Sequence, residues 1–325
     1  MKHKDRVYGE IEIRDSIILD LINCPTIQRL KQIDQAGYLE PFFPGTAQSR
    51  FEHSLGVYYL LKIYNAPLEE QIAGLIHDVS HSIFSHCIDY ILDVGSETDH
   101  SHQDNIFDEF VRKSEIPEIL KKYNLDLNYI LNDKNFPLKE KNLPDLCADR
   151  IDYALRTAIV FKDIENGKYF LDNLVVKDRN WIFKNFESAK KFAELFYKLN
   201  SEYFAGLPSA IMFRTVGDCL RLALSKQYIS EKDLYTTDKE VVEKIKSYLE
   251  KDFDLKILFD RMNNKIKIEN NPDNYEKKVF CKSRIINPLC YYNKEIKKVS
   301  EVDSEWKKII IQESQPKEYF LKFEK

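Results

Sequence analysis

Apolar side chains recur every three to four residues over most of the chain, the spacing that gathers them on one face of an α-helix. The segments with this spacing are 15–36 (divided before Pro25), 50–64, 68–79, 82–92, 101–113, 117–123, 144–161, 188–199, 209–224 and 239–249. Ser49 and Glu52 have the spacing of a capping box directly before an apolar run, which predicts a helix start near Arg50. The pattern therefore predicts a mainly helical protein.

Strand-like patterns are short. Residues 7–14 alternate weakly, and residues 174–183 predict a hairpin whose turn lies at 178–180. Beyond residue 252 the strand-like runs are 256–262, 265–269, 278–286 and 318–323. We predict a mostly all-α fold with a small β-hairpin. It would consist of a helical domain (1–250) and a minor α+β part (251–325) packed on it.

The composition of the 325 residues narrows the class of protein. Apolar residues make up 43% and charged residues 31%, and the net charge of −4 gives no basic field for nucleic acid. The Lys-rich stretches 135–141 and 263–267 are interpreted as solvated surfaces. The six cysteines form no CxxC pair, and neither a signal peptide nor a membrane-spanning apolar run is visible. We therefore expect a cytoplasmic protein without a membrane or nucleic-acid partner.

Residues 74–87 concentrate titratable side chains in an otherwise apolar segment. Three of the seven histidines of the chain lie there (His77, His81 and His86), and Asp78 directly follows the first of them. For this segment alone, a metal site and chance clustering are equally good interpretations.

Two other predicted helices favour the metal site. His53 lies in the first turn of the helix that starts near Arg50, and Asp149 lies on the polar face of the helix at 144–161. Together with His77 and Asp78 they offer two imidazoles and two carboxylates. This mixed set suits one divalent transition metal such as Mn, Fe, Co, Ni or Zn, which orients phosphoryl oxygens and lowers the pKa of bound water.

The motifs RFEHSLGV (50–57), GLIHDVSHSIFSH (74–86) and ADRIDY (148–153), in this order, resemble those of the HD-domain metal-dependent phosphohydrolases. The resemblance extends over residues 6–160. Within that superfamily the chain is most similar to the branch of dGTPases and SAM/HD-domain dNTP triphosphohydrolases, in a short bacterial form. The resemblance implies a helical HD core in which His53, His77, Asp78 and Asp149 bind the metal.

The resemblance also implies roles around the substrate. Six positions match family residues that contact phosphate (Arg50, His81, His86) or lie near the sugar and phosphates (Gln35, Arg150, Tyr153). The catalytic residues would be His81 and His102, with Asp89 orienting the imidazole of His102. His100 is the alternative to His102, although spacing to the apolar residues that follow favours His102.

Some positions that would read the substrate depart from the family pattern: Ala36, Gln103 and Thr157 stand where a Leu, a Glu and an acid are expected. The leading hypothesis is a (d)NTP triphosphohydrolase-like reaction, in which water assisted by the metal or by His102 attacks phosphorus; Mg is a candidate companion of the nucleotide. The alternatives are a phosphomonoesterase or phosphodiesterase, and a nucleotide-binding regulatory protein without turnover. The resemblance alone implies a homo-oligomer.

Overall fold

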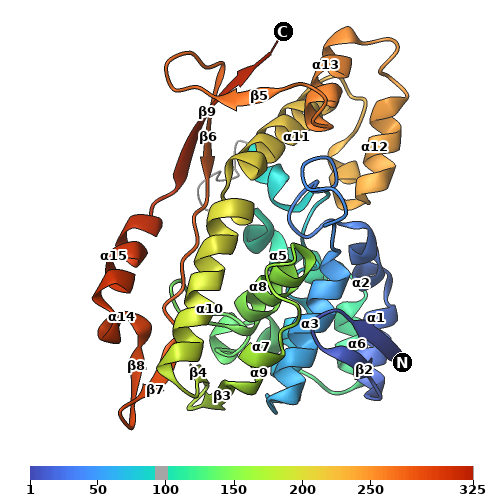
Figure 1. Cartoon of the computed structure of the whole chain (residues 1–325). Helices are drawn as coiled ribbons and strands as arrows, with labels where there is room; N and C mark the ends of the chain where they lie inside the picture. Colours follow the sequence, from blue (N-terminus) through green and yellow to red (C-terminus); the bar gives the residue numbers. More distant parts are fainter. Residues whose placement is uncertain (92–101, 325) are drawn as a thin grey trace.

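The computed structural model describes residues 1–91 and 102–324, and helices make up most of it (Figure 1). The α-helices are α1 (Ser16–Asn23), α2 (Pro25–Arg29), α3 (Arg50–Ile63), α4 (Leu68–Ile76), α5 (His102–Arg112), α6 (Ile116–Lys122), α7 (Leu127–Leu131), α8 (Ala148–Val160), α9 (Lys168–Asp172), α10 (Phe186–Leu199), α11 (Leu207–Ser225), α12 (Asp238–Lys246), α13 (Phe253–Met262), α14 (Val299–Val302) and α15 (Ser304–Glu313). Shorter helical turns are η1 (Leu30–Gln32), η2 (Ser85–Tyr90), η3 (Asp133–Asn135), the π-helix η4 (Asn200–Phe204) and η5 (Glu231–Tyr235). The strands are β1 (Lys2–Asp5), β2 (Gly9–Glu12), β3 (Leu174–Lys177), β4 (Asn180–Phe183), β5 (Ile268–Asn270), β6 (Lys277–Cys281), β7 (Leu289–Tyr292), β8 (Glu295–Lys298) and β9 (Lys317–Phe323). The prediction of a mostly helical fold with minor strand content is confirmed.

Helix α3 lies in the interior and begins where the sequence predicts. The Ser49 hydroxyl accepts the backbone N–H of Glu52, and the Glu52 carboxylate accepts the backbone N–H of Ser49. The buried residues of α3 lie on all sides of the helix, whereas a surface helix has a single apolar stripe. Because α3 packs against both α4 and α8, it brings the three predicted metal-binding segments together.

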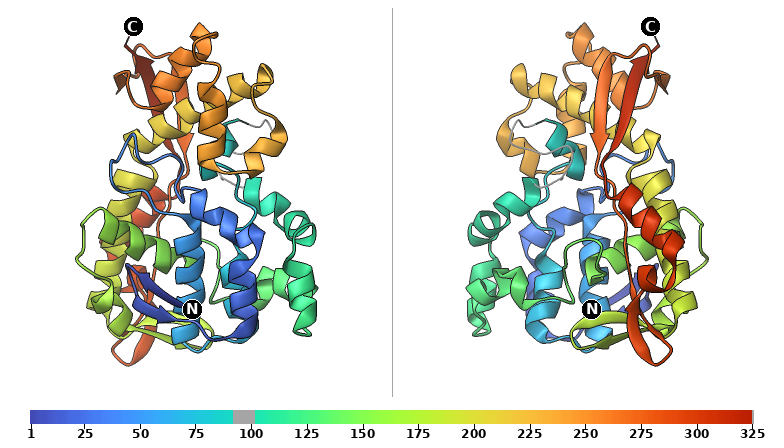
Figure 2. Two further views of the ribbon diagram at one scale, coloured as in Figure 1. Left: turned by 90° about the vertical axis from the view of Figure 1, so that its right-hand side faces the viewer. Right: turned by 90° about the vertical axis from the view of Figure 1, so that its left-hand side faces the viewer.

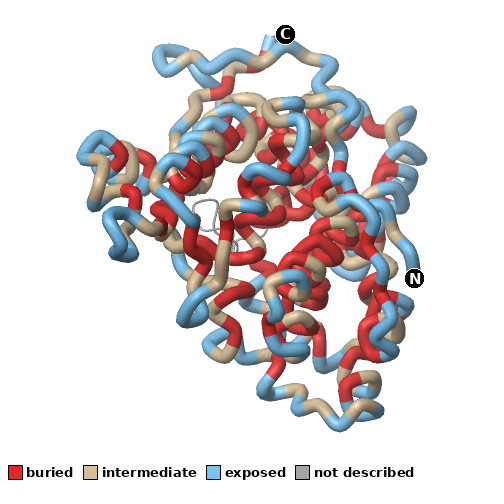
Figure 3. Tube along the Cα trace, turned by 60° about the horizontal axis from the view of Figure 1, so that its bottom comes forward, coloured by how far each residue is buried: buried red, intermediate tan, exposed pale blue. Residues whose placement is uncertain are grey.

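The buried apolar side chains of the described residues form three clusters. One joins α11 to η2, α12 and α13; a second joins α3 to α8, α10 and the β3–β4 hairpin; a third joins α3 to α1, α4 and α6. Figure 3 shows the buried stretches in the interior and the exposed ones toward the periphery. No helix within the described part of the chain is both long and apolar enough to cross a bilayer.

Small sheets lie at the periphery. Strands β1 and β2 pair antiparallel, and the predicted hairpin β3–β4 is extended in the order β3-β4-β7-β8, with β7 parallel to β4. A third sheet has the order β5-β9-β6. Figures 1 and 2 show the C-terminal segment (orange to red) running along the molecule between the last two sheets. The division at residue 250 stays a prediction, and the C-terminal part completes a sheet with strands that precede it.

The segment 82–92 differs from its predicted helix. It contains the 3₁₀ turn η2, and the backbone is left-handed both at Phe84 (φ 51°), which precedes η2, and at Ser85 (φ 45°), its first residue. The Asp238 carboxylate accepts the backbone N–H of Phe84, and the Ser85 hydroxyl donates to the Asp34 carbonyl. These contacts with distant residues replace the helical hydrogen bonds that the local sequence favours.

The segment 256–262, predicted as a strand, belongs to α13. Leu255, Phe259 and Met262 are buried at intervals of four and three residues, which is helical spacing. Asp252 starts the helix by accepting the backbone N–H of Leu255.

Candidate metal centre

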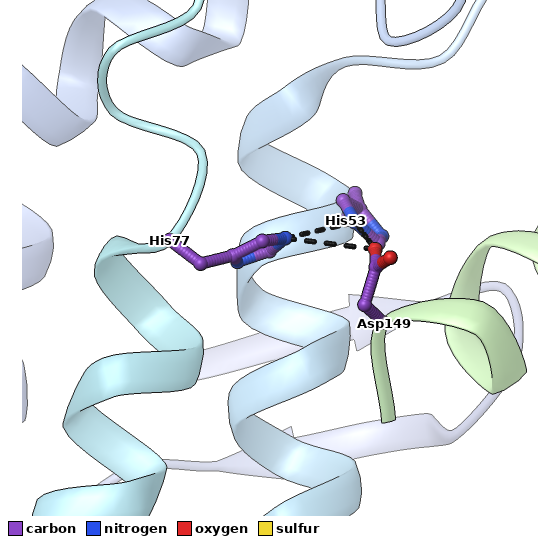
Figure 4. Close-up of side chains that lie close together, drawn as sticks. All are labelled: His53, His77 and Asp149. Carbon is purple, nitrogen blue, oxygen red and sulfur yellow. Dashed lines mark hydrogen bonds and ion pairs between the residues drawn. The ribbon is translucent and has the colours of Figure 1, made fainter. Parts of the chain in front are cut away.

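Three side chains from three helices meet at one point in the interior (Figure 4). His53 comes from the first turn of α3, His77 follows the last residue of α4, and Asp149 lies in the first turn of α8. His53 Nε2 lies 3.2 Å from His77 Nε2 and 2.9 Å from Asp149 Oδ1, and His77 Nε2 lies 3.6 Å from the same oxygen. The three ligand atoms are close enough together to share one ion.

Each of the two imidazoles is held by its other ring nitrogen. His53 Nδ1 lies 2.7 Å from Asp152 Oδ2, and His77 Nδ1 lies 2.7 Å from the carbonyl oxygen of Gly74. Because these acceptors take the Nδ1–H, both Nε2 atoms are directed at the shared point, as in metal-binding histidines. Two nitrogens and a carboxylate oxygen fit a borderline divalent ion.

Asp152 is a site residue that the sequence analysis did not identify. It is fully buried, and besides His53 its carboxylate accepts hydrogen bonds from the Tyr8 hydroxyl (2.9 Å) and from two nitrogens of Arg156 (2.9 Å each). A signal was present in the sequence, since Asp152 lies four residues before Arg156 and one helical turn after Asp149.

The network continues from Arg156 to the N-terminal hairpin. Arg156 is fully buried, and its Nη1 pairs with Asp5, at the end of β1, at 3.0 Å. A side chain at Gly56 of α3 would collide with both Asp152 and Arg156, which accounts for a glycine in the middle of that helix. The hairpin thus supports a candidate metal ligand through two buried side chains.

Asp78 lies beside the cluster. Its Oδ1 is 3.4 Å from His77 Nε2 and its Oδ2 is 3.8 Å from His53 Nε2, while Arg50 Nη1 donates to Oδ2 at 2.7 Å. Burial raises the pKa of Asp78, but the charges of Arg50 and His77 outweigh it and hold that pKa well below its usual range. Asp78 is therefore an anion, and its role as a fourth ligand stays a prediction.

Arg50, expected at the phosphate, is 3% exposed and held by three partners. Besides the bond to Asp78, its Nε donates to Ser85 Oγ and its Nη2 to the Gln35 carbonyl, each at 2.7 Å. These bonds use three of the five N–H donors of a guanidinium. Arg50 lines the cavity at the site, so the other donors remain for a ligand there.

The pKa values of two histidines of the site are shifted in opposite directions. Burial lowers the pKa of His53, but its hydrogen bonds with Asp149 and Asp152 and the charge of Asp78 raise it to about 9. Burial and the charge of Arg50 lower the pKa of His81 to about 3. His81 is therefore a neutral imidazole near pH 7, with a single N–H to donate.

A cavity of about 570 Å³ opens onto the cluster. The predicted site residues that line it are Gln35, Arg50, His53, His77, Asp78, His81, His86, Asp149, Arg150 and Tyr153. Residues outside that prediction that also line it include Gln48, Phe107, Thr157, Tyr203, Phe204, Phe213, Lys282 and Arg284. Gln35 and Gln48 each have a buried Oε1 with no hydrogen-bond partner among the described residues.

Arg150 and Tyr153 are held differently from each other. Arg150 donates to the carbonyl oxygens of Lys141 (2.6 Å) and Asp145 (3.1 Å), and pairs with Glu140 at 3.0 Å. Its guanidinium is therefore committed to the loop before α8. The Tyr153 ring lies 6.5 Å from that of His53, and burial raises the pKa of its hydroxyl above the usual value.

The structure does not bring His102 to the metal cluster. Its Nε2 lies 3.0 Å from the Tyr235 hydroxyl, and within the described residues it is not among those that line the cavity. The contact that the structure shows for Asp89 is with the backbone, since its Oδ1 accepts the N–H of His102 at the start of α5. The role of Asp89 in orienting the imidazole stays a prediction. His100, the alternative, lies outside the described residues.

A helical scaffold that directs two imidazoles and carboxylates into a cavity defines a class of metal-dependent hydrolases. Residues 50–157 match the HD domain. The chain is 36% identical over 245 residues to the uncharacterized protein YdhJ of Bacillus subtilis, with 74% of each chain covered. It is 34% identical to the metal-dependent phosphohydrolase cns2 of Cordyceps militaris, over 49% of this chain and 45% of that protein. It is 28% identical to the deoxynucleoside triphosphate triphosphohydrolase SAMHD1 of Mus musculus, over 61% of this chain and 35% of that protein.

The fold is similar over its whole length to a solved structure. A phosphohydrolase from Bacteroides thetaiotaomicron superposes with a TM-score of 0.76 at 19% identity, covering 100% of both chains. The chain therefore belongs to the HD-domain superfamily and is a metal-dependent phosphohydrolase of that superfamily.

Proposed function

We propose that this phosphohydrolase acts on a nucleotide, in a (d)NTP triphosphohydrolase-like reaction. The observation that carries the proposal is the convergence of His53 Nε2, His77 Nε2 and Asp149 Oδ1 at the wall of a cavity of about 570 Å³. That volume lies within the range of small-molecule sites. These three side chains would hold a divalent Mn, Fe, Co, Ni or Zn ion, which would supply positive charge for phosphoryl oxygens and lower the pKa of bound water.

The residues around the cluster suit a phosphate ester attached to a flat ring. Arg50 has N–H donors left for phosphate oxygens, and the neutral imidazole of His81 lines the same cavity, as does His86. On other walls, Tyr153 and Phe204 pack edge to face at 5.3 Å and present aromatic surface on which a base can stack. The likeness to SAMHD1, whose name states a deoxynucleoside triphosphate substrate, supports this choice.

The proposal is tested by product analysis. Wild type and a His77→Ala/Asp78→Ala variant are incubated with NTPs, dNTPs, NMPs, cyclic nucleotides and p-nitrophenyl phosphate, with each ion supplied separately and with Mg added to the nucleotides. Ion exchange then resolves phosphate, pyrophosphate and triphosphate. Release of triphosphate by the wild type alone is the expected result. Release of orthophosphate alone would indicate a phosphomonoesterase or phosphodiesterase instead.

A second candidate is a nucleotide-binding regulatory protein without turnover. The observation that favours it is the position of His102, whose ring contacts Tyr235 rather than the cavity wall. Equilibrium binding of a nucleotide that stays intact for hours, with every ion tested, would support this candidate over the hydrolase.

The location and assembly of the protein also stay predictions. A cytoplasmic location follows from the sequence analysis, and a homo-oligomer is implied by the resemblance alone. Light scattering after size exclusion would measure the oligomer directly.

A further inference from the structure

The segment 282–288, which joins β6 to β7, forms part of the cavity wall. Lys282 and Arg284 line the same cavity as the candidate metal ligands, although more than 120 residues separate them from Asp149. The segment links two different sheets, since β6 belongs to the sheet β5-β9-β6 and β7 to the sheet β3-β4-β7-β8. The basic side chains therefore reach the site from outside the HD-domain match at 50–157.

A buried polar network fixes the backbone of this segment. Asn200, fully buried at the start of the π-helix η4, accepts the backbone N–H of Arg284 at 2.8 Å and donates to Ser283 Oγ at 3.0 Å. Glu313 Oε2 accepts hydrogen bonds from Asn200 Nδ2 (3.3 Å) and Ser283 Oγ (3.2 Å). Because a buried network with satisfied partners is rigid, the Arg284 side chain starts from a fixed backbone position. A π-turn inside a helical segment is also frequent at functional sites.

The charge balance of the cavity sets Arg284 apart from three other cations on its walls. Arg50 pairs with Asp78, Lys139 with Asp133, and Arg150 with Glu140. Each of these three cations therefore has a carboxylate neighbour.

Arg284 has a different environment. Its guanidinium donates to the Lys282 carbonyl oxygen at 3.3 Å, and among residues 1–91 and 102–324 no carboxylate lies within ion-pair distance of it. A half-buried guanidinium with most of its N–H donors unassigned is suited to a bidentate anion.

We propose that Arg284, assisted by Lys282, forms an anion subsite that binds substrate phosphates beyond the one at the metal cluster. The proposal rests on the proposed function and deepens it, because it selects substrates with two or more phosphates over monophosphates. Tyr153 connects the two regions. Its ring lies 6.5 Å from that of His53. Burial raises the pKa of its hydroxyl, and the positive charge of Arg284 acts against that rise. The C-terminal segment is then a part of the substrate site.

The test measures binding of inorganic tripolyphosphate and orthophosphate by calorimetry, on wild type, Arg284→Gln and Arg112→Gln loaded with Mn. Arg112 is an exposed arginine of α5 that pairs with Asp108, and serves as the matched control. A charge-assisted bidentate contact predicts a loss of about tenfold or more in tripolyphosphate affinity for Arg284→Gln. We expect less than about a twofold change for orthophosphate, which binds at the metal cluster, and for Arg112→Gln with either anion.

The outcomes separate the subsite from the proposed function. Unchanged tripolyphosphate affinity in Arg284→Gln, or no tripolyphosphate binding by wild type, would overturn the subsite even if wild type hydrolyses nucleotides. A wild type that is inert on every phosphate compound would overturn the proposed function, while selective loss of tripolyphosphate binding would still support the subsite. Thermal unfolding and metal content identify a misfolded variant. In that case Lys282→Gln takes its place, and unchanged tripolyphosphate affinity there overturns the subsite as well.

Discussion

The buried pair between Arg156 and its two carboxylates offers a sharp test of the structure. Arg156 has no exposed surface and donates twice to Asp152 and once to Asp5. Replacing it with methionine preserves much of the side-chain volume but leaves both carboxylates in the interior without their cation. Desolvation then opposes folding, because neither carboxylate can reach water.

The magnitude follows from the geometry. Removing one partner of a buried ion pair costs about 3–5 kcal/mol. With an unfolding entropy of about 2.1 cal/mol/K for each of 325 residues, that loss lowers the Tm by about 4–7 °C. Some hydrogen bonds to the two carboxylates survive, from Tyr8 and His53 to Asp152 and from the backbone of Val7 to Asp5. They limit the loss to this range.

The assay is thermal unfolding of Arg156→Met beside Arg112→Met. Arg112 makes the same type of doubly bonded contact, with a carboxylate four residues before it, at 2.6 and 3.0 Å, but its side chain is 43% exposed. Such a surface pair contributes about 0.5 kcal/mol, or a Tm change below about 1 °C. Adding Asp5→Asn to Arg156→Met removes one of the two buried carboxylate charges that lack a cation, and should recover part of the lost Tm. Equal Tm changes in the two single variants would refute the reasoning.

Three further predictions concern the same scaffold. Asp152→Asn weakens the hold on His53 Nδ1 and should reduce Mn or Zn affinity about 10–100-fold in equilibrium dialysis; unchanged affinity would count against the tautomer argument. Gly56→Ala places a methyl group against Asp152 and Arg156, so calorimetry should show a Tm lowered by several degrees; an unchanged Tm would contradict the close approach of the two side chains to α3. Burial raises the pKa of Asp89 to about 7 from an unfolded value of 3.8, so the folded state retains a proton between these limits and loses that stabilisation as pH rises through 7. Asp89→Asn keeps an acceptor for the His102 amide, and in urea unfolding its stability relative to wild type should rise from pH 5 to pH 8; a constant difference would contradict the assigned pKa.

The elements that local sequence specifies were predicted well. The Ser49–Glu52 capping box predicted the start of α3, and the alternating pattern at 174–183 predicted the β3–β4 hairpin. Both signals act between residues close in the chain, so no knowledge of the tertiary structure is needed. The HD-domain motifs likewise placed His53, His77 and Asp149 on separate helices, and the packing of α3 on α4 and α8 brings them together.

The failures have tertiary causes. Residues 82–92 have an apolar helical pattern, yet Asp238, about 150 residues later, takes the backbone N–H of Phe84 and holds a left-handed turn. The Asp89 carboxylate accepts the amide N–H of His102, and the ring of His102 contacts Tyr235. Neither partner is indicated by the local pattern. Asp152 differs, since its spacing on α8 is visible in the sequence, whereas its contact with His53 depends on the packing of α3 against α8.

The division of the cavity between two parts of the chain explains why the reaction class is easier to infer than the substrate. The HD-domain match at 50–157 contains all four predicted metal ligands, His53, His77, Asp78 and Asp149. A comparison with the family is therefore enough to infer the metal chemistry. Other residues that line the cavity come from η4, α11 and the segment after β6, which lie outside that match. In the proposed function, these residues would determine what fits beside the phosphate at the ion. Two proteins that share the HD motifs can therefore share a mechanism and differ in substrate, and for this chain Arg284 is the residue whose replacement should reveal the difference first.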